Sequence, residues 1–162
     1  IMAIHAVPTI SDEIYLQDVS ERVKEMEGKN CPKKERAWVK VRQATESDQL
    51  QVSQRHADTE VLWMADGSAK EKRSRNVLED RMFKAYLVMV GTGNIFAMED
   101  KPVFEFADKD DYPKFKGTYS KFQDRWGLLQ PAVADAIELA IYKLNPQWDV
   151  FGLMSEEDEE GE

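Results

Sequence analysis

The sequence predicts a mainly α, single small helical domain with a minor β-strand or hairpin element and a disordered acidic C-terminal tail. Two apolar stripes at helical spacing, in residues 70–90 and 131–144, predict the main helices. Alternating apolar and charged residues at 37–42 predict the β element. The expected organisation is an N-terminal arm (1–36), a helical domain (37–150) and a disordered acidic tail (151–162).

The N-terminal arm contains short apolar groups separated by proline and glycine. Residues 9–16 suit either an extended segment or an early turn of helix, and both alternatives remain open. Ser11 and Asp18 are both candidate N-caps for a short helix that runs to Met26. Residues 29–36 are polar and basic, so we expect a loop there.

The helical domain is predicted to begin with a strand over residues 37–42, followed by a helix. Thr45 and Asp48 have the spacing of a capping box, which starts a helix. Gly67 suits the residue just after the end of this helix. Its predicted apolar face consists of Leu50, Ala57, Val61 and Met64.

The longest predicted helix covers residues 70–90. Its apolar stripe consists of Leu78, Met82, Ala85 and Met89, widened by Tyr86 and Val90. Gly91 and Gly93 are predicted to end it. Residues 95–106 then suit extended structure, as in an edge hairpin around Pro102, and residues 108–117 suit a loop.

Two further helices are predicted near the end of the domain. Thr118 is expected to cap a short helix that carries Tyr119, Phe122 and Trp126. Pro131 suits the first turn of the second helix, which Pro146 stops. The apolar face of the second helix consists of Ala132, Val133, Ala136, Ile137, Ala140, Ile141 and Leu144.

The negative charge of the chain is concentrated at one end. Six acidic residues and no basic residue lie in 155–162; the whole chain has a net charge of −9, and the remainder without these six acids has −3. A block of this kind is usually a solvated tail, and the nearly balanced remainder argues against both a DNA mimic and a nucleic-acid binder. Cys31 is the one cysteine, and no apolar run reaches the roughly 20 residues of a membrane helix. We therefore expect a soluble protein of a reducing cytoplasm.

Residue patterns typical of catalysis are missing from the sequence, so we expect a protein that is not an enzyme and has no metal or cofactor. His5 and His56 lie among residues that suit ordinary surface or packing roles. The acidic residues 108–111 lack the turn glycine and the final glutamate of a calcium loop. The basic residues in 70–75 favour a solvated helix start, or a dock for acids, over a phosphate site.

The remaining signal is apolar surface. Tryptophan and methionine adapt to irregular binding surfaces, although they also fill cores. Trp148, beyond the helix stop, is the tryptophan most expected to contact a partner. The predicted partner-binding residues are Leu78, Met82, Tyr86, Met89, Phe122, Trp126, Val133, Ile137, Ile141 and Trp148.

Four segments within residues 37–150 carry a family resemblance. They are Trp38-Val-Lys-Val-Arg-Gln-Ala-Thr-Glu, the basic helix leading into Tyr86-Leu-Val-Met-Val, Phe122-x-x-x-Trp126-Gly-x-Leu-x-Pro131, and Asn145-Pro-x-Trp148. Together they resemble the tail assembly chaperones of long-tailed, siphovirus-like bacteriophages. The resemblance implies a helical late protein of the host bacterial cytoplasm that binds the tape measure protein, helps to recruit tail tube subunits and has no catalytic residues.

The expected mechanism is capture of an amphipathic client helix in a groove between the helices of residues 78–89 and 133–144. The acidic tail would keep the loaded complex soluble. Weak self-association is also expected, and neither nucleic acid nor membrane is an expected partner. Two alternatives remain open: a phage-encoded regulator or inhibitor that binds a host protein, and a structural head or tail component.

Overall fold

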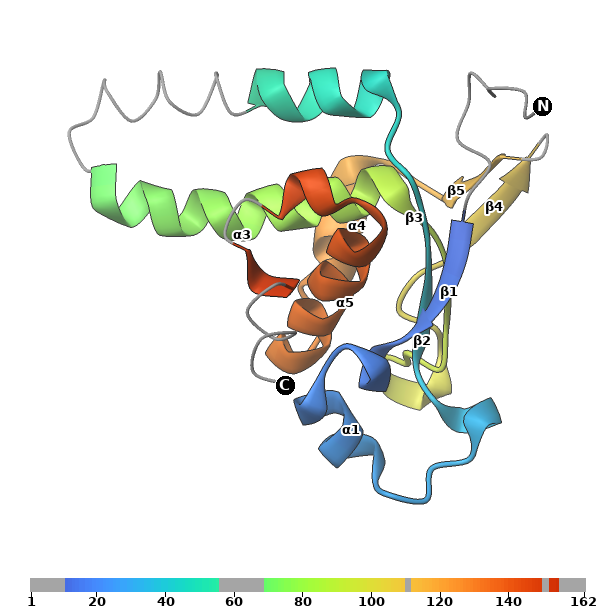
Figure 1. Cartoon of the computed structure of the whole chain (residues 1–162). Helices are drawn as coiled ribbons and strands as arrows, with labels where there is room; N and C mark the ends of the chain where they lie inside the picture. Colours follow the sequence, from blue (N-terminus) through green and yellow to red (C-terminus); the bar gives the residue numbers. More distant parts are fainter. Residues whose placement is uncertain (1–10, 56–68, 110–111, 150–151, 155–162) are drawn as a thin grey trace, which may run out of the picture.

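The computed structural model describes residues 11–55, 69–109, 112–149 and 152–154. Within them, helices are accompanied by two small antiparallel sheets, so the predicted mainly α fold with a minor β element is confirmed (Figure 1). In chain order the elements are β1 (Ser11–Tyr15), α1 (Glu21–Glu27), β2 (Trp38–Arg42), a helix at residues 46–55, α3 (Ala69–Val88), β3 (Met89–Gly93), β4 (Phe106–Lys109), β5 (Tyr112–Phe115), α4 (Tyr119–Trp126) and α5 (Pro131–Leu144). Single 3₁₀ turns occur at Leu16–Asp18, Lys33–Glu35, Met98–Asp100 and Pro146–Trp148.

The larger sheet has the strand order β1-β2-β3, with the predicted strand β2 in the middle. Because side chains alternate along a strand, Val39 and Val41 of β2 share the inner face, where Ile14 of β1 lies opposite Val39. Trp38 pairs with Gly93 of β3. A Cβ atom at Gly93 would overlap the Trp38 indole ring, so only glycine fits at this position against the ring.

Residues 11–27, assigned from sequence to an N-terminal arm, contribute a strand and core side chains. Residues 11–15 are extended, which decides between the two alternatives for this region. Ser20 caps α1 by accepting a hydrogen bond from the Val23 amide at 3.3 Å. The predicted caps are wrong, since Ser11 lies inside β1 and Asp18 inside a 3₁₀ turn.

The helix at residues 46–55 begins with the predicted capping box. The Asp48 amide donates to Thr45 Oγ1 at 3.3 Å, and the Thr45 amide donates to Asp48 Oδ2 at 2.8 Å. The prediction that Leu50 faces the core is wrong, because its side chain is exposed. Asp48 and Val52 face the core instead, since Arg42 Nη1 holds the buried Asp48 carboxylate at 2.7 Å from Oδ2. Ala57, Val61, Met64 and Gly67 lie outside the described residues.

The end of α3 differs from the prediction. The helix stops at Val88, and Met89–Gly93 forms β3. Pairing of this segment with β2 therefore overrides the helical spacing that places Met89 on the same stripe as Leu78. Gly91 and Gly93 are strand residues and do not terminate a helix.

The region that follows is more ordered than predicted. The extended interpretation of residues 95–106 is confirmed in part by a bridge between Phe96 and Pro102. The predicted loop at residues 108–117 is wrong, because β4 and β5 form a hairpin in which Phe106 lies opposite Phe115. The acidic and proline residues of this hairpin concealed its alternation.

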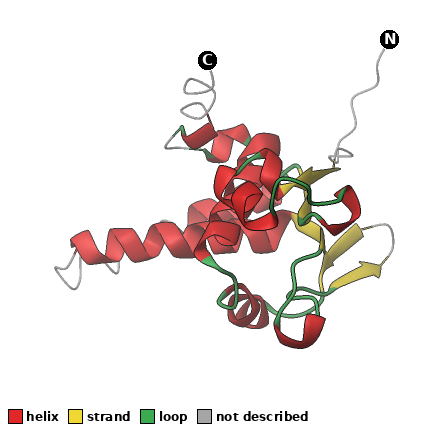
Figure 2. Cartoon of the chain, turned by 90° about the horizontal axis from the view of Figure 1, so that it is seen from below, coloured by secondary structure: helices red, strands yellow, loops and turns green. Residues whose placement is uncertain are grey.

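The two final helices agree with the prediction. Thr118 Oγ1 accepts from the Lys121 amide at 3.3 Å, and Pro131 is the first residue of α5. α5 is the central element, since it packs against β2, α1 and α3. Seen from below, α3 extends well beyond this body (Figure 2). The acidic residues 155–162 lie outside the described part of the chain, whereas Leu153 and Met154, assigned to the tail, pack against the core.

Candidate functional site

The apolar stripe of α3 passes from the interior of the domain to its surface. Ala85 is fully buried, Met82 is half-buried and Leu78 is 54% exposed. These positions share one helix face because they are separated by four and three residues. Figures 1 and 2 show α3 continuing past the helices α4 and α5 that it contacts. The same face is therefore packed at one end and open to solvent at Leu78.

Charged side chains fix α3 at the point where it leaves the body. Arg81 donates a hydrogen bond to the Asp135 carboxylate of α5. Lys84 is 3% exposed and pairs with Asp80 of the same helix at 2.7 Å, which compensates the cost of burying its ammonium group. Its ammonium also lies 5.9 Å from the ring centroid of Tyr142 on α5. α3 is thus attached to α5 through Arg81 and Lys84, one to two turns from the exposed Leu78.

The ten predicted partner-binding residues lie mostly inside the domain. Buried are Met89, Phe122, Trp126, Ile137, Ile141 and Trp148; half-buried are Met82, Tyr86 and Val133; and Leu78 is exposed. α3 and α5 contact each other directly, so their facing surfaces are already used. In the described structure these buried residues hold the fold together, and another molecule could contact them only if the domain opened.

An aromatic cluster centred on Phe122 accounts for several of these burials. The Phe122 ring centroid lies 5.2 Å from that of Phe104, 5.1 Å from Phe115 and 5.9 Å from Trp126. Such distances are typical of favourable aromatic pairs. Sequence reasoning missed Phe104 and Phe115 as members, although the Phe104-x-Phe106 spacing was an available strand signal.

The Asn145-Pro-x-Trp148 segment closes the domain internally. Asn145 is fully buried; its Oδ1 accepts from the Ala44 amide at 2.8 Å, and its Nδ2 donates to the Arg42 carbonyl at 3.1 Å. Trp148, for which the sequence favours a partner contact, is 4% exposed, and its Nε1 donates to Gln49 Oε1 at 2.9 Å. The segment therefore attaches the end of α5 to the junction between β2 and the helix at residues 46–55.

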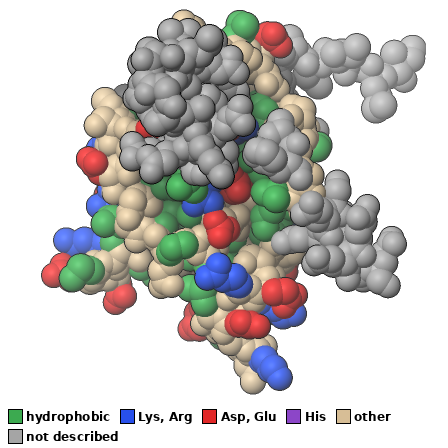
Figure 3. All heavy atoms as spheres, turned by 90° about the vertical axis from the view of Figure 1, so that its left-hand side faces the viewer, with side chains coloured by type: hydrophobic (Ala, Val, Ile, Leu, Met, Phe, Trp, Pro, Cys, Tyr) green, Lys and Arg blue, Asp and Glu red, His purple; other side chains and the backbone are tan. Residues whose placement is uncertain are grey.

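Further exposed apolar side chains, none of them among the ten predicted partner-binding residues, occur on other elements. Met98 is 88% exposed, and Phe96 54%. Both lie in a turn whose Glu99 and Asp100 have positive φ angles of 64° and 56°, values that non-glycine residues rarely adopt. The remaining members are Met26, Leu50 and Leu128. Figure 3, viewed from the projecting side of α3, shows hydrophobic side chains among acidic and basic ones on its described part.

Few side chains in the described structure are placed for catalysis or metal binding. The pKa of the half-buried Cys31 thiol is raised by desolvation and by the nearby carboxylates of Glu27 and Glu35, which disfavours the reactive thiolate. Among the described residues, no three His, Cys, Asp or Glu side chains are grouped to hold a metal ion. His5, His56 and residues 110–111 lie outside that part of the chain. None of the described helices is long and apolar enough to cross a membrane.

No family model, curated protein or solved structure matches this chain. The phage-chaperone resemblance thus rests on the quoted segments alone, whose roles in the fold are now visible. The first is β2 with the following helix start, the third joins α4 to α5, and the last attaches α5 to β2. These three segments meet around α5, so in this domain they form part of the packed framework and not an exposed binding surface.

Proposed function

We propose that this chain is a non-enzymatic phage tail assembly chaperone. It binds the tape measure protein, and also tail tube subunits, and keeps the client soluble in the host bacterial cytoplasm during tail assembly. The observation that carries the proposal is the α3 stripe, which leaves the core and continues into solvent at Leu78, 54% exposed.

The physical argument is that two helices, one in this chain and one in the client, each have an apolar stripe without a packing partner. A tape measure protein is largely amphipathic helix, and its apolar stripe has no partner before the tube forms. Burying a fully exposed leucine contributes about 1.5–3 kcal/mol, so covering Leu78, which is 54% exposed, contributes roughly half of this. This contact would fix the position of a client helix on α3, while further contacts supply the rest of the affinity. Leu78 and half-buried Met82 supply the accessible contacts without opening the domain. Residues 155–162, expected to be disordered, would keep the loaded complex soluble through their six acids.

The test is co-expression with the candidate tape measure protein, scored by client solubility and co-purification. Leu78→Asp places a charge on the open stripe and should abolish co-purification. Leu128→Asp is the matched control, because Leu128 is 58% exposed in the turn after α4 and has no part in the stripe. Both substitutions are at exposed positions, so both variants should melt within a few degrees of the wild type.

A client that remains insoluble beside the wild-type chain would contradict the proposal. Equal loss of capture in both leucine variants would also contradict it, because the effect would then be one of charge and not of the α3 stripe. Loss in Leu78→Asp alone, with an unchanged circular dichroism spectrum, would support capture by α3.

A further inference from the structure

We propose that the basic hollow beside α4 is a docking site for an acidic segment of a partner protein that also carries an apolar side chain. This site is on a different surface from Leu78, and its occupancy does not depend on the chaperone function.

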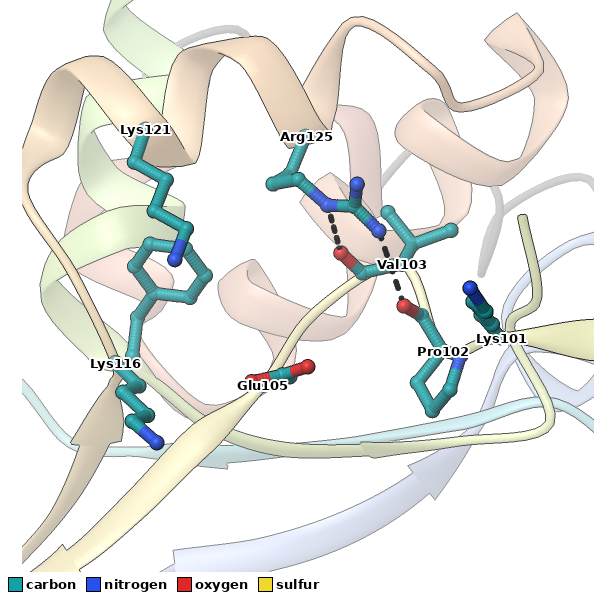
Figure 4. Close-up of a pocket in the computed structure, with 8 residues that line it drawn as sticks. Lys101, Pro102, Val103, Glu105, Lys116, Lys121 and Arg125 are labelled. Atoms are coloured by element: carbon teal, nitrogen blue, oxygen red, sulfur yellow. Dashed lines mark hydrogen bonds between the residues drawn. The ribbon is translucent and has the colours of Figure 1, made fainter. Parts of the chain in front are cut away.

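The hollow lies between α4, the end of β5 and the strand-like segment that follows the 98–100 turn. It has a volume of about 330 Å³, within the range of sites that hold small ligands or side chains. Its lining residues are Lys101, Pro102, Val103, Glu105, Phe115, Lys116, Lys121 and Arg125. Figure 4 shows Lys121 and Arg125 coming from α4, Lys116 and Lys101 at opposite ends, and Glu105 between them.

The charge of this lining is opposite to that of the chain. Four basic side chains and one acidic side chain surround the hollow, whereas the whole chain has a net charge of −9. Lys116 and Lys121 are exposed and form no ion pair within the described residues. Lys101 lies 3.7 Å from Glu99, but both side chains are at least 75% exposed, so this pair contributes little. Most of the positive charge is therefore available to a ligand.

The position of Lys121 strengthens this local excess. It lies in the first turn of α4, where the helix dipole favours an acidic residue, and α4 has none there. A cation at this end of a helix is locally unfavourable, and an anionic group bound in the hollow would compensate both the lysine and the dipole.

The floor of the hollow is apolar. Val103 and Phe115 are 2% and 4% exposed, so the floor of the hollow belongs to the aromatic core. Arg125 is held over it, since its Nε donates to the Val103 carbonyl at 2.6 Å and its Nη2 to the Pro102 carbonyl at 3.1 Å. An occupant with carboxylates outside and one apolar side chain inside satisfies both walls.

An acidic peptide fits this geometry better than a nucleic acid. Base readout and phosphate tracking use extended basic surfaces, whereas this site is one hollow in a chain whose overall charge repels a long polyanion. Glu105 within the lining also disfavours a closely bound phosphate, whereas it can accept a hydrogen bond from a peptide amide.

The test is fluorescence anisotropy with the full chain and a labelled short peptide of glutamates around one central phenylalanine. The peptide should bind, and the double variant Lys116→Glu with Lys121→Glu should weaken it about tenfold or more. The double variant Lys24→Glu with Lys143→Glu, at exposed lysines on α1 and α5, makes the same change of net charge; it is the matched control and should change affinity less than about twofold. Replacing the central phenylalanine by alanine should also weaken binding, because the apolar floor would lose its contact.

Four outcomes would overturn the proposal. They are no binding of the glutamate peptide, equal binding of a lysine peptide, equal weakening by the matched Lys24→Glu, Lys143→Glu variant, or full displacement by inorganic phosphate, which would indicate a small-anion site. A fifth concerns the acids of residues 155–162: if their replacement by glutamine strongly tightens peptide binding, the occupant is the chain's own acidic segment and not a partner's.

Discussion

Replacing Asn145 by alanine should destabilise the whole domain, because this side chain joins α5 to β2. Asn145 is fully buried and forms three side-chain hydrogen bonds, to Ala44, Arg42 and Ile141. The Ile141 carbonyl retains a second donor, the Asn145 amide at 2.9 Å. The substitution therefore removes the acceptor of the Ala44 N–H and one donor to the Arg42 carbonyl.

The expected size follows from the Ala44 N–H. A buried backbone group that loses its partner costs about 1–3 kcal/mol, so the free energy of unfolding should fall by about that amount. For a chain of this size that corresponds to a fall in Tm of about 2–12 °C. Urea unfolding followed by circular dichroism measures it, with a lower midpoint and an unchanged m value.

Two further variants make the result decisive. Asn30→Ala, at an exposed asparagine, should change the free energy of unfolding by less than about 0.5 kcal/mol. Asn145→Asp retains an acceptor for Ala44 but turns a negative oxygen toward the Arg42 carbonyl, so its loss should be at least as large as that of Asn145→Ala. A loss below about 1 kcal/mol in Asn145→Ala would refute the attribution of domain closure to this residue.

Two other perturbations test the sheet and the buried charges. Gly93→Ala forces a Cβ atom into the Trp38 ring and should lower the free energy of unfolding by about 1–3 kcal/mol, measured in urea. Gly127→Ala, where the nearest atom is 3.5 Å away, is the control and should cost much less. Equal losses in the two variants would argue against the clash. Burial raises the pKa of Glu138, although Arg81 opposes the effect, so the folded state holds this proton more tightly than the unfolded state. The stability that this group contributes is therefore present at low pH and is lost as the pH rises from about 4.5 through the raised pKa. Glu138→Gln should therefore flatten this decline of stability with pH, and the variant should be no less stable than wild type at pH 7. A steeper decline in the Gln variant would show that the sign is wrong.

Local signals explain which parts of the fold could be predicted. The Thr45 and Thr118 caps, the start of α5 at Pro131 and the strand at Trp38 depend on residues close in sequence, and each appears as expected. The end of α3 depends instead on pairing with β2 some fifty residues earlier in the chain, which helical spacing does not report. The β4–β5 hairpin was missed for a related reason, because its stabilising contacts are aromatic and distant.

The candidate surfaces were harder to predict than the fold. A stripe such as Leu78 to Ala85 looks uniform in sequence, and only the three-dimensional position of α4 and α5 decides where it becomes exposed. Trp148 illustrates the opposite error, since its place after a helix stop suggested exposure although a hydrogen bond to Gln49 holds it inside. The basic hollow combines residues from three elements, each of which appeared as an ordinary surface lysine or arginine.

The attachment by Asn145 also determines when the domain can close during synthesis of the chain. The Ala44 amide and its acceptor are 101 residues apart, so at about 5–20 residues per second the junction after β2 waits roughly 5–20 s before its partner is made. Throughout that interval residues 42–49 have been synthesised but lack the hydrogen bonds that Asn145 and Trp148 form with them. The domain therefore closes only after α5 has been translated, and any factor that acts on the nascent chain meets β2 and the helix at residues 46–55 before they are secured.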